Sequence, residues 1–340
     1  MVITGSERIL KGDYEIKEML YFDWVQKICA EKNISIKGKI THVKDDKLFC
    51  ISSNIGDLYL KKTGSFIIDE LFFTLNLMEL GLISLPEWVG YDHDMSVCLM
   101  RDMGGCDLSL LPTLDMETSL NMFISLARLQ KDSIQYVKSE DFCGFDYRIG
   151  TMLDELKDLP ESAYKMLYDT QYRITRDEKE KLKQNAAYVK TVLEFIINLC
   201  LPDTIHHGDL GTYNVRIIEK KSIFYDWGCG GVSHPFFDTF RLLSSIRGKL
   251  PTDISAKEII IDTYLREWSE YGSRDELKNI FTAIDGLAGF YMAYVKYIRA
   301  RNLHLSFAEK PEAISVDGLG LDRRYETAAI YLKRFIENDF

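Results

Sequence analysis

The sequence lacks several features that would assign it at once to a class of protein. Its seven cysteines include no C-x-x-C pair, so neither a zinc cluster nor a disulfide framework is indicated. Only 7 prolines and 22 glycines occur in 340 residues, which excludes a mainly disordered or fibrous chain. No apolar run approaches the roughly 18 residues that cross a bilayer, and Met1–Lys11 has no apolar signal-peptide core. We therefore expect a folded cytoplasmic protein with reduced thiols.

Basic residues are also in the minority. The 42 lysines and arginines face 52 aspartates and glutamates, which gives a formal net charge of −10. A surface of that sign repels nucleic-acid phosphates and anionic lipid headgroups unless its basic residues are segregated. We therefore expect neither a nucleic acid nor a membrane as a partner. The same charge weakly favours a cationic small molecule, although solubility alone explains it equally well.

The hydrophobic pattern of the first hundred residues predicts an antiparallel sheet with two helices. An amphipathic helix is predicted over Tyr14–Glu31, and a second helix runs from Ser65 to Leu80 and ends at Gly81. Short β-rich runs separated by turn residues predict five strands. These runs are Lys39–Val43, Leu48–Ser52, Leu58–Lys62, Glu87–Tyr91 and Ser96–Met100.

The rest of the chain is mostly helical in period, apart from short β-rich runs within Asp203–Trp227. Helices are predicted at Met116–Lys131, Ile149–Leu159, Arg176–Leu199, Phe236–Arg247, Ser255–Tyr271, Asp275–Arg301 and Arg323–Glu337. The sequence thus predicts an α+β fold of two lobes with a cleft between them. The small N-terminal lobe would span residues 1–103 and the large helical C-terminal lobe residues 104–340.

The most informative segment has acidic, amide and acidic side chains in that order. Asp209 and Asn214 lie within His206–Val215, and Asp226 follows after a predicted hairpin formed by Val215–Ile218 and Ile223–Tyr225. Phosphoryl transfer needs a group that orients the attacking hydroxyl and oxygen ligands that hold Mg²⁺ against nucleotide phosphates. Asp209 would orient the hydroxyl, whereas Asn214 and Asp226 would bind Mg²⁺. The hairpin would fold Asp226 back beside Asn214.

These segments resemble the aminoglycoside phosphotransferase family, whose fold is similar to that of protein kinases. The resemblance lies in H-G-D-L-G-T-Y-N at 207–214, Y-D-W-G at 225–228 and S-H-P-F-F-D at 233–238. It implies that Asp238 braces the main chain of the catalytic loop. Upstream, L-Y-L-K at 58–61 resembles the third strand of the family's small lobe, which makes Lys61 the phosphate-binding lysine.

The resemblance also implies the other nucleotide contacts. Glu70 is the natural partner of Lys61, with its neighbour Asp69 less favoured. Lys62 is the rival of Lys61, because successive strand residues face opposite sides and only one of the two can face a nucleotide. The segment Leu99–Gly105 resembles the hinge between the lobes. Its main chain at Arg101 and Met103 would meet the purine edge, with Met100 at the back of the pocket.

Two departures from protein kinases are visible in the sequence. No G-x-G-x-x-G lies between the first two predicted strands, where Lys44–Lys47 forms the turn, and no A-P-E follows Asp226. A protein kinase regulated by an activation loop is therefore disfavoured. The sequence instead predicts a small-molecule kinase that transfers the γ-phosphoryl group of ATP or GTP, with Mg²⁺, to a hydroxyl group.

The resemblance favours a cationic aminoglycoside or a related antibiotic as the acceptor. A metabolite kinase of the choline, sugar or homoserine type is the alternative. A non-catalytic nucleotide-binding module of the same fold is a second alternative, disfavoured because Asp209, Asn214 and Asp226 are all present. The aromatic residues within Phe290–Tyr297 predict a core-facing stripe, although they could wall an acceptor pocket. Glu337, Asp339 and Phe340 are further acceptor candidates, although a solvated tail accounts for them better.

Overall fold

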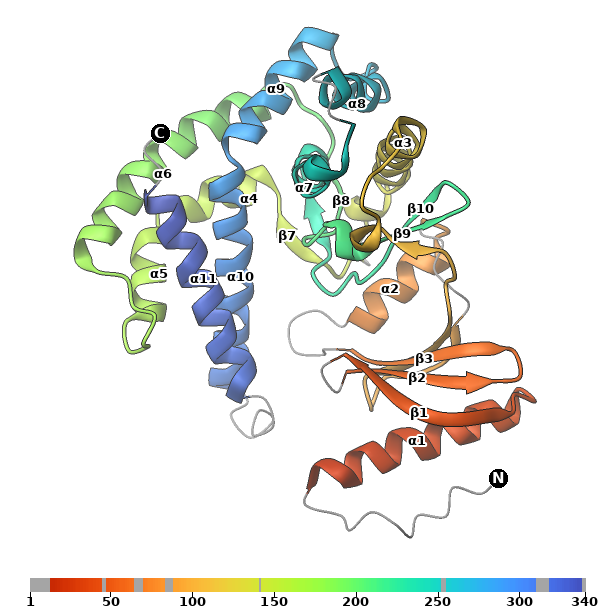
Figure 1. Ribbon diagram of the computed structural model, residues 1–340. Coiled ribbons are helices and arrows are strands. Elements are labelled where there is room, and N and C mark those ends of the chain that lie inside the picture. The colour runs from red at the N-terminus through yellow and green to blue at the C-terminus, as the bar shows by residue number, and fades with distance from the viewer. Residues whose placement is uncertain are drawn as a thin grey trace. The chain divides into compact units, whose positions relative to one another are not determined.

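The computed structural model describes residues 13–44, 47–63, 70–82, 88–140, 142–251, 255–309 and 318–337 (Figure 1). The chain divides into two compact units. The first unit contains residues 1–65 and 85–104, and the second contains residues 66–84 and 105–340. The last passage from the first unit to the second lies between Gly104 and Gly105, whose φ angles are 68° and 66°. Glycine adopts this left-handed conformation at little cost.

The first unit is an antiparallel sheet with one helix. Its strands are β1 (Ile36–Lys44), β2 (Leu48–Ser53), β3 (Gly56–Lys62), β4 (Trp88–Asp92) and β5 (Val97–Arg101), and its helix is α1 (Asp13–Glu31). The strand order is β1-β2-β3-β5-β4. Leu58 and Leu60 of β3 are buried in one cluster with Val25 and Cys29 of α1, so α1 covers one face of the sheet. This arrangement confirms the five predicted strands and the first helix.

Helix α2 (Glu70–Glu79) is part of the second unit. The sequence places it in the N-terminal lobe because it lies between the strands of that lobe. In the structure its buried residues Phe73 and Leu77 belong to the hydrophobic core of the second unit. Burial of this apolar face, rather than position in the sequence, therefore decides which unit the helix joins. Gly81 follows the helix with a φ of 68°, as the C-cap prediction requires.

The second unit is mostly helical. Its other helices are α3 (Met116–Asp132), α4 (Ile149–Leu156), α5 (Leu159–Leu167), α6 (Arg176–Ile197), α7 (Phe236–Ile246), α8 (Ser255–Arg266), α9 (Arg274–Gly286), α10 (Ala288–Glu309) and α11 (Gly318–Glu337). Two predicted helices are divided in the structure. The helix predicted over Ile149–Leu159 ends at Leu156 before α5 begins, and the one predicted over Asp275–Arg301 breaks at Leu287 into α9 and α10. Among the described residues, no helix has the length and apolar character of a membrane span.

Two small sheets accompany these helices. Their strands are β6 (Cys106–Asp107), β7 (Phe145–Tyr147), β8 (Thr204–His206), β9 (Val215–Ile218), β10 (Lys221–Phe224) and β11 (Gly231–Ser233). The strand orders are β10-β9-β6 and β7-β11-β8. The sequence predicts the hairpin of β9 and β10 and the strand β8. It misses β6, β7 and β11, because two or three residues are too few to show an alternating pattern.

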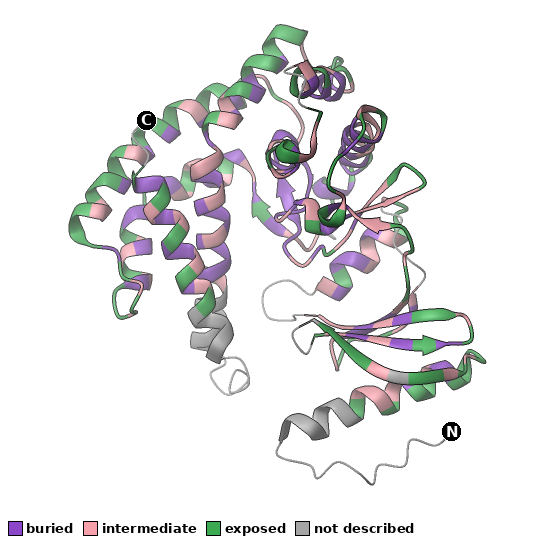
Figure 2. Ribbon diagram, viewed as in Figure 1, coloured by how far each residue is buried: buried purple, intermediate pink, exposed green. Residues whose placement is uncertain are grey.

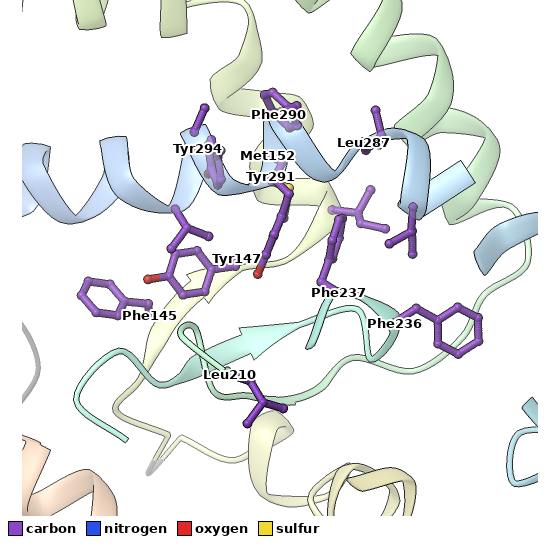
Figure 3. Close-up of a cluster of buried hydrophobic side chains, with 14 of the residues drawn as sticks. Phe145, Tyr147, Met152, Leu210, Phe236, Phe237, Leu287, Phe290, Tyr291 and Tyr294 are labelled. Carbon is purple, nitrogen blue, oxygen red and sulfur yellow. The ribbon is translucent and has the colours of Figure 1, made fainter. Parts of the chain in front are cut away.

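Helix α10 is central to the core of the second unit. From residue 288 to residue 300 it has no exposed position, whereas α6 exposes one side along its length (Figure 2). The aromatic residues Phe290, Tyr291 and Tyr294 of α10 all point into a buried cluster (Figure 3). The ring of Tyr291 stacks on that of Phe237 from α7, with centroids 3.8 Å apart. The predicted core-facing stripe is thus confirmed.

Replacing Phe237 by alanine should lower the free energy of unfolding by about 3–5 kcal/mol, because it opens a cavity and removes the stack on Tyr291. Urea denaturation followed by circular dichroism measures this loss. The matched control is Phe195→Ala on α6, where the ring is 50% exposed; it should cost less than about 1 kcal/mol. Equal losses for the two variants would contradict the central position of Phe237.

Candidate active site

Two strand pairs in the second unit bring the predicted catalytic and metal-binding segments together. β8 is antiparallel to β11, and β9 is antiparallel to β10. Residues 207–214 join β8 to β9, and residues 225–230 join β10 to β11. Both ends of the first segment therefore lie beside an end of the second. At one junction the N–H of Tyr225 donates to the carbonyl of Asn214 at 3.1 Å.

Side-chain hydrogen bonds fix these two segments further. The amide Nδ2 of Asn214 donates to the main-chain carbonyl of Asp209 at 3.0 Å. The ring Nε2 of His207 donates to the carbonyl of Tyr225 at 2.8 Å. Since Asp226 directly follows Tyr225, these bonds hold the acidic, amide and acidic residues of the motif in one neighbourhood.

Gly208 lets the two segments approach closely. Its φ is 76°, and a Cβ built on it would lie 2.0 Å from the carbonyl oxygen of Cys229. Any larger residue would collide with that main-chain atom. The close approach explains why glycine stands at position 208.

The carboxylate of Asp238, in the first turn of α7, braces the start of the segment formed by residues 207–214. Its Oδ2 accepts the N–H of His207 at 2.6 Å, and its Oδ1 lies 3.0 Å from Nδ1 of His206. The hydroxyl of Tyr291 lies 2.5 Å from the other ring nitrogen of His206. Burial opposes ionisation of Asp238, but the neighbouring His206 and His207 outweigh it and lower the pKa of this carboxyl. The bracing contact that the resemblance implies is present.

Asp209 lies among hydrogen-bond donors and cations. Its Oδ1 accepts the hydroxyl of Tyr213 at 3.0 Å and lies 3.5 Å from Nζ of Lys296 and 3.8 Å from Nη2 of Arg241. Arg241 in turn donates to the Tyr213 hydroxyl at 3.1 Å. Burial raises the pKa of Asp209, but the charges of Lys296 and Arg299 reverse that effect and hold the pKa below its usual value. Asp209 is therefore ionised at neutral pH.

The predicted metal-binding segment is packed under α2. Asp226 has a φ of 67°, a left-handed conformation that costs energy for a residue with a side chain and is often found at functional sites. A Cβ on Gly228 would lie 2.9 Å from Oε2 of Glu70, and one on Gly230 would lie 2.1 Å from the ring of Phe73. Only glycine allows α2 to approach this closely. The Glu70 carboxylate thus lies against the segment that begins at Asp226.

The remaining predicted nucleotide residues, Lys61, Met100, Arg101 and Met103, lie in the first unit. Strand register places Lys61 opposite Cys98, and Tyr59 opposite Met100. Lys61 and Met100 therefore share the sheet face that points away from α1.

The rival lysine lies on the other face of this sheet. The Nζ of Lys62 is 4.8 Å from the ring centroid of Tyr21 on α1 and 5.0 Å from that of Phe49. Its charge is therefore held over two aromatic rings on the α1 side. This geometry supports Lys61 over Lys62 as the residue that faces a nucleotide.

Several residues around Asp209 are absent from the sequence prediction. They are Tyr213, Arg241, Lys296 and Arg299. The spacing of the aromatic residues at 290–297 predicts a core-facing stripe. The two charged residues of the same helix, Lys296 and Arg299, are therefore not proposed as site residues from the sequence. The available signal was the presence of Lys296 and Arg299 one turn apart within the otherwise apolar run Tyr291–Ala300.

Residues 69–277, more than half of the chain, match the model of the phosphotransferase enzyme family. No curated protein sequence is similar enough to the chain to count as a relative. Among solved structures, choline kinase from Cryptosporidium parvum has 10% identity, covers 93% of this chain and 94% of its own, and gives a TM-score of 0.58.

Two further structures are similar at the same level. Macrolide 2′-phosphotransferase from Brachybacterium faecium has 13% identity, with 94% of this chain and 98% of its own covered and a TM-score of 0.52. A choline/ethanolamine kinase family protein from Mesorhizobium loti has 16% identity, with 91% and 99% covered and a TM-score of 0.50. Likeness at these identities shows the fold, and it confirms the predicted protein-kinase-like α+β fold.

Replacing Asp238 by asparagine should lower the free energy of unfolding at about pH 7 by about 3 kcal/mol, because it removes a buried charge that has partners. The native pKa of Asp238 is lowered from the ordinary value of 3.8. Its ionisation therefore stabilises the fold above about pH 4, and this contribution disappears as the pH falls through the native pKa.

Urea denaturation of both proteins at several pH values measures the difference. The gap between wild type and Asp238→Asn should narrow steadily below about pH 4. Asp154→Asn, at an exposed position of α4, is the control and should change stability little at any pH. A gap that stays constant down to about pH 2 would show that the Asp238 charge does not stabilise the fold.

Proposed function

The chain belongs to the phosphotransferase enzyme family, and we propose that it transfers the γ-phosphoryl group of ATP or GTP to a hydroxyl group of a small molecule. The observation that carries this proposal is the meeting of residues 207–214 and 225–230 through two strand pairs. Asp209, Asn214 and Asp226 lie on these two segments, in the order that phosphoryl transfer requires.

Asn214 and Asp226 are the proposed ligands of Mg²⁺. Asn214 is 4% exposed, and its Nδ2 is bonded to Asp209. Its Oδ1 accepts no hydrogen bond from the described residues and is available to a cation. One amide oxygen and one carboxylate suit Mg²⁺, which completes its coordination with water and substrate phosphates rather than with a protein cage. When bound, the ion neutralises charge that develops on the transferred phosphoryl group.

Asp209 is the proposed group that orients the acceptor hydroxyl. Its lowered pKa means that it is a weak base and remains a carboxylate throughout the neutral range. Phosphoryl transfer passes through a loose transition state, so positioning of the hydroxyl matters more than early removal of its proton. Tyr213 holds the Oδ1 atom by its hydrogen bond of 3.0 Å. A carboxylate fixed in this way is suited to accept a hydrogen bond from the attacking hydroxyl.

For the nucleotide, we assign Lys61 to the phosphates, with Glu70 as its partner. The main chain of Arg101 and Met103 would contact the purine, and Met100 would pack behind it. The shared face of Lys61 and Met100 on the sheet of the first unit supports this assignment.

The acceptor class is the finer part of the proposal. The sequence resemblance favours an aminoglycoside, with choline, a sugar or homoserine as alternatives. A cationic acceptor is bound best by carboxylates around the reacting hydroxyl. The described residues closest to the Asp209 carboxylate include the cations Lys296 and Arg241 instead. Charge therefore gives more support to a neutral or anionic metabolite than to a polycation.

The wild-type protein should hydrolyse ATP or GTP slowly in the presence of Mg²⁺, and Asp226→Ala should abolish both this turnover and the gain in nucleotide affinity that Mg²⁺ provides. Release of ADP or GDP and calorimetric titration with and without Mg²⁺ measure the two effects. Asp154→Ala is the control and should behave as wild type. If Asp226→Ala retains wild-type turnover and affinity, the chain is a binding module of the same fold and not an enzyme.

Asp209→Asn should lower kcat by about 10²- to 10⁴-fold, because the asparagine cannot orient and finally accept the proton of the hydroxyl. The nucleotide KM should change little, since Asp209 is assigned to the acceptor. Steady-state kinetics with the acceptor that stimulates nucleotide turnover most strongly give both constants. Similar changes in kcat and nucleotide KM would refute the assigned role.

A further inference from the structure

Two cationic side chains, Lys296 and Arg241, lie within 4 Å of the Asp209 carboxylate, and the charges of Arg299 and Arg324 also act on it. Lys296 and Arg299 are one turn apart on α10, Arg241 lies on α7 and Arg324 on α11. Lys296 and Arg241 approach Oδ1 of Asp209 to 3.5 and 3.8 Å. Burial and, after it, the charge of Arg299 lower the pKa of Arg324. The cations thus form one cluster, which we call the Asp209 cation cluster.

Arg299 is the most unusual member of this cluster. The residue is only 7% exposed. Its guanidinium group makes no hydrogen bond or ion pair of normal length with the part of the chain that the structure describes. Its electrostatic neighbours include Asp209, Asp226 and Cys229, so the group is directed at the candidate active site. A guanidinium group has five N–H donors, and none of the Arg299 nitrogen atoms is among the buried atoms that lack a partner, so solvent or an anion can reach them.

The cluster also carries more positive charge than its neighbours cancel. Two carboxylates, Asp209 and Asp226, are among the groups that act most strongly on Arg299. Two cations, Lys296 and Arg241, share the one carboxylate of Asp209, and the proposed function commits Asp226 to Mg²⁺. This excess of positive charge is confined to the neighbourhood of Asp209, whereas the chain as a whole has a net charge of −10. An anion that entered this cluster would meet attraction and unused hydrogen-bond donors together.

We propose that the Asp209 cation cluster is the acceptor subsite for an anionic group, so that the molecule whose hydroxyl is phosphorylated carries a carboxylate or a phosphate. This inference rests on the proposed function, in which Asp209 orients that hydroxyl. Lys296 and Arg241 both form their ion pairs with Asp209. The cations therefore lie around the residue assigned to the acceptor, whereas the donor phosphates are assigned to Asn214 and Asp226.

Matched three-carbon alcohols test the charge preference. Glycerate and glycerol 3-phosphate are the anionic probes, glycerol is the neutral one, and 2-amino-1,3-propanediol is the cationic one. Each is titrated calorimetrically into wild-type protein that already holds Mg²⁺ and a non-hydrolysable ATP analogue. The analogue fills the position of the transferred phosphoryl group, so a probe must bind elsewhere. The wild type should bind at least one anionic probe roughly tenfold or more tightly than the neutral and cationic ones.

Variants at Arg299 test whether the cluster causes this preference. Arg299→Met should weaken binding of the anionic probe by roughly ten- to a hundredfold, whereas Arg299→Lys, which keeps the charge, should retain part of it. Arg301→Met is the matched control, because Arg301 lies on the same helix but is paired with Glu155 at 2.9 Å; it should bind the probe as wild type does. Thermal unfolding shows whether each variant is folded, and Lys296→Met replaces Arg299→Met if the latter is not.

Several results would overturn the proposal. They are tighter binding of the cationic probe, no detectable binding of either anionic probe to wild type, or a folded Arg299→Met protein that binds the anion unchanged. If Arg299→Met weakens only the ATP analogue, the cluster serves the donor phosphates and the proposal is wrong. Slow Mg²⁺-dependent hydrolysis by wild type separates these failures from failure of the proposed function, which would remove hydrolysis as well.

Discussion

The buried carboxylate of Asp238 is the contact on which the candidate site most depends. It joins the first turn of α7 to the main chain of His207 and to the ring of His206. His206 in turn meets the hydroxyl of Tyr291 on α10. One negative charge, placed at the favourable N-terminal end of a helix, thus links the three elements that supply Asp209, Arg241 and Lys296. The contacts of Asp238 and the stack of Phe237 on Tyr291 hold these elements together. They therefore fix how far Asp209, Arg241 and Lys296 lie from one another.

The sequence predicts well those features that extend over many residues. The strands of the first unit are long enough to alternate, and the order of Asp209, Asn214 and Asp226 is specific enough to indicate phosphoryl transfer. The hairpin between β9 and β10 is also predicted, and its turn residues Glu219 and Lys220 both have positive φ angles. In each case a local pattern agrees with the final structure.

Other features could not be read from the sequence, for identifiable reasons. Strands β7 and β11 owe their existence to pairing with each other and with β8 across a wide separation in the sequence. The break between α9 and α10 has no proline, and Gly286 and Gly289 are its only local signs. Helix α10 is covered on all sides up to residue 300, so its period does not show which face meets Asp209. Lys296 and Arg299 act on Asp209 only because the fold places α10 beside residues 207–214, and the sequence alone does not show this placement.

Net charge and local charge lead to opposite expectations for the acceptor. The formal charge of −10 is distributed over a large surface, where solvent and salt screen it within about 10 Å. The cations beside Asp209 are partly or largely removed from water, so their field at the reacting hydroxyl is stronger than that of distant surface carboxylates. The local field therefore carries more weight than the net charge in the proposal of an anionic acceptor.

The cations near Asp209 also control whether its carboxyl group is ionised. A carboxylate in a buried site would ordinarily take up a proton, and a protonated Asp209 could not accept a hydrogen bond from the acceptor hydroxyl through that oxygen. Lys296 and Arg299 prevent this by lowering its pKa. An amine of a polycationic acceptor could replace Lys296 at the carboxylate, but it would then lie beside the charges of Arg299 and Arg241. Under the proposed function, the anionic group of an acceptor would be attracted by these cations instead of repelled by them.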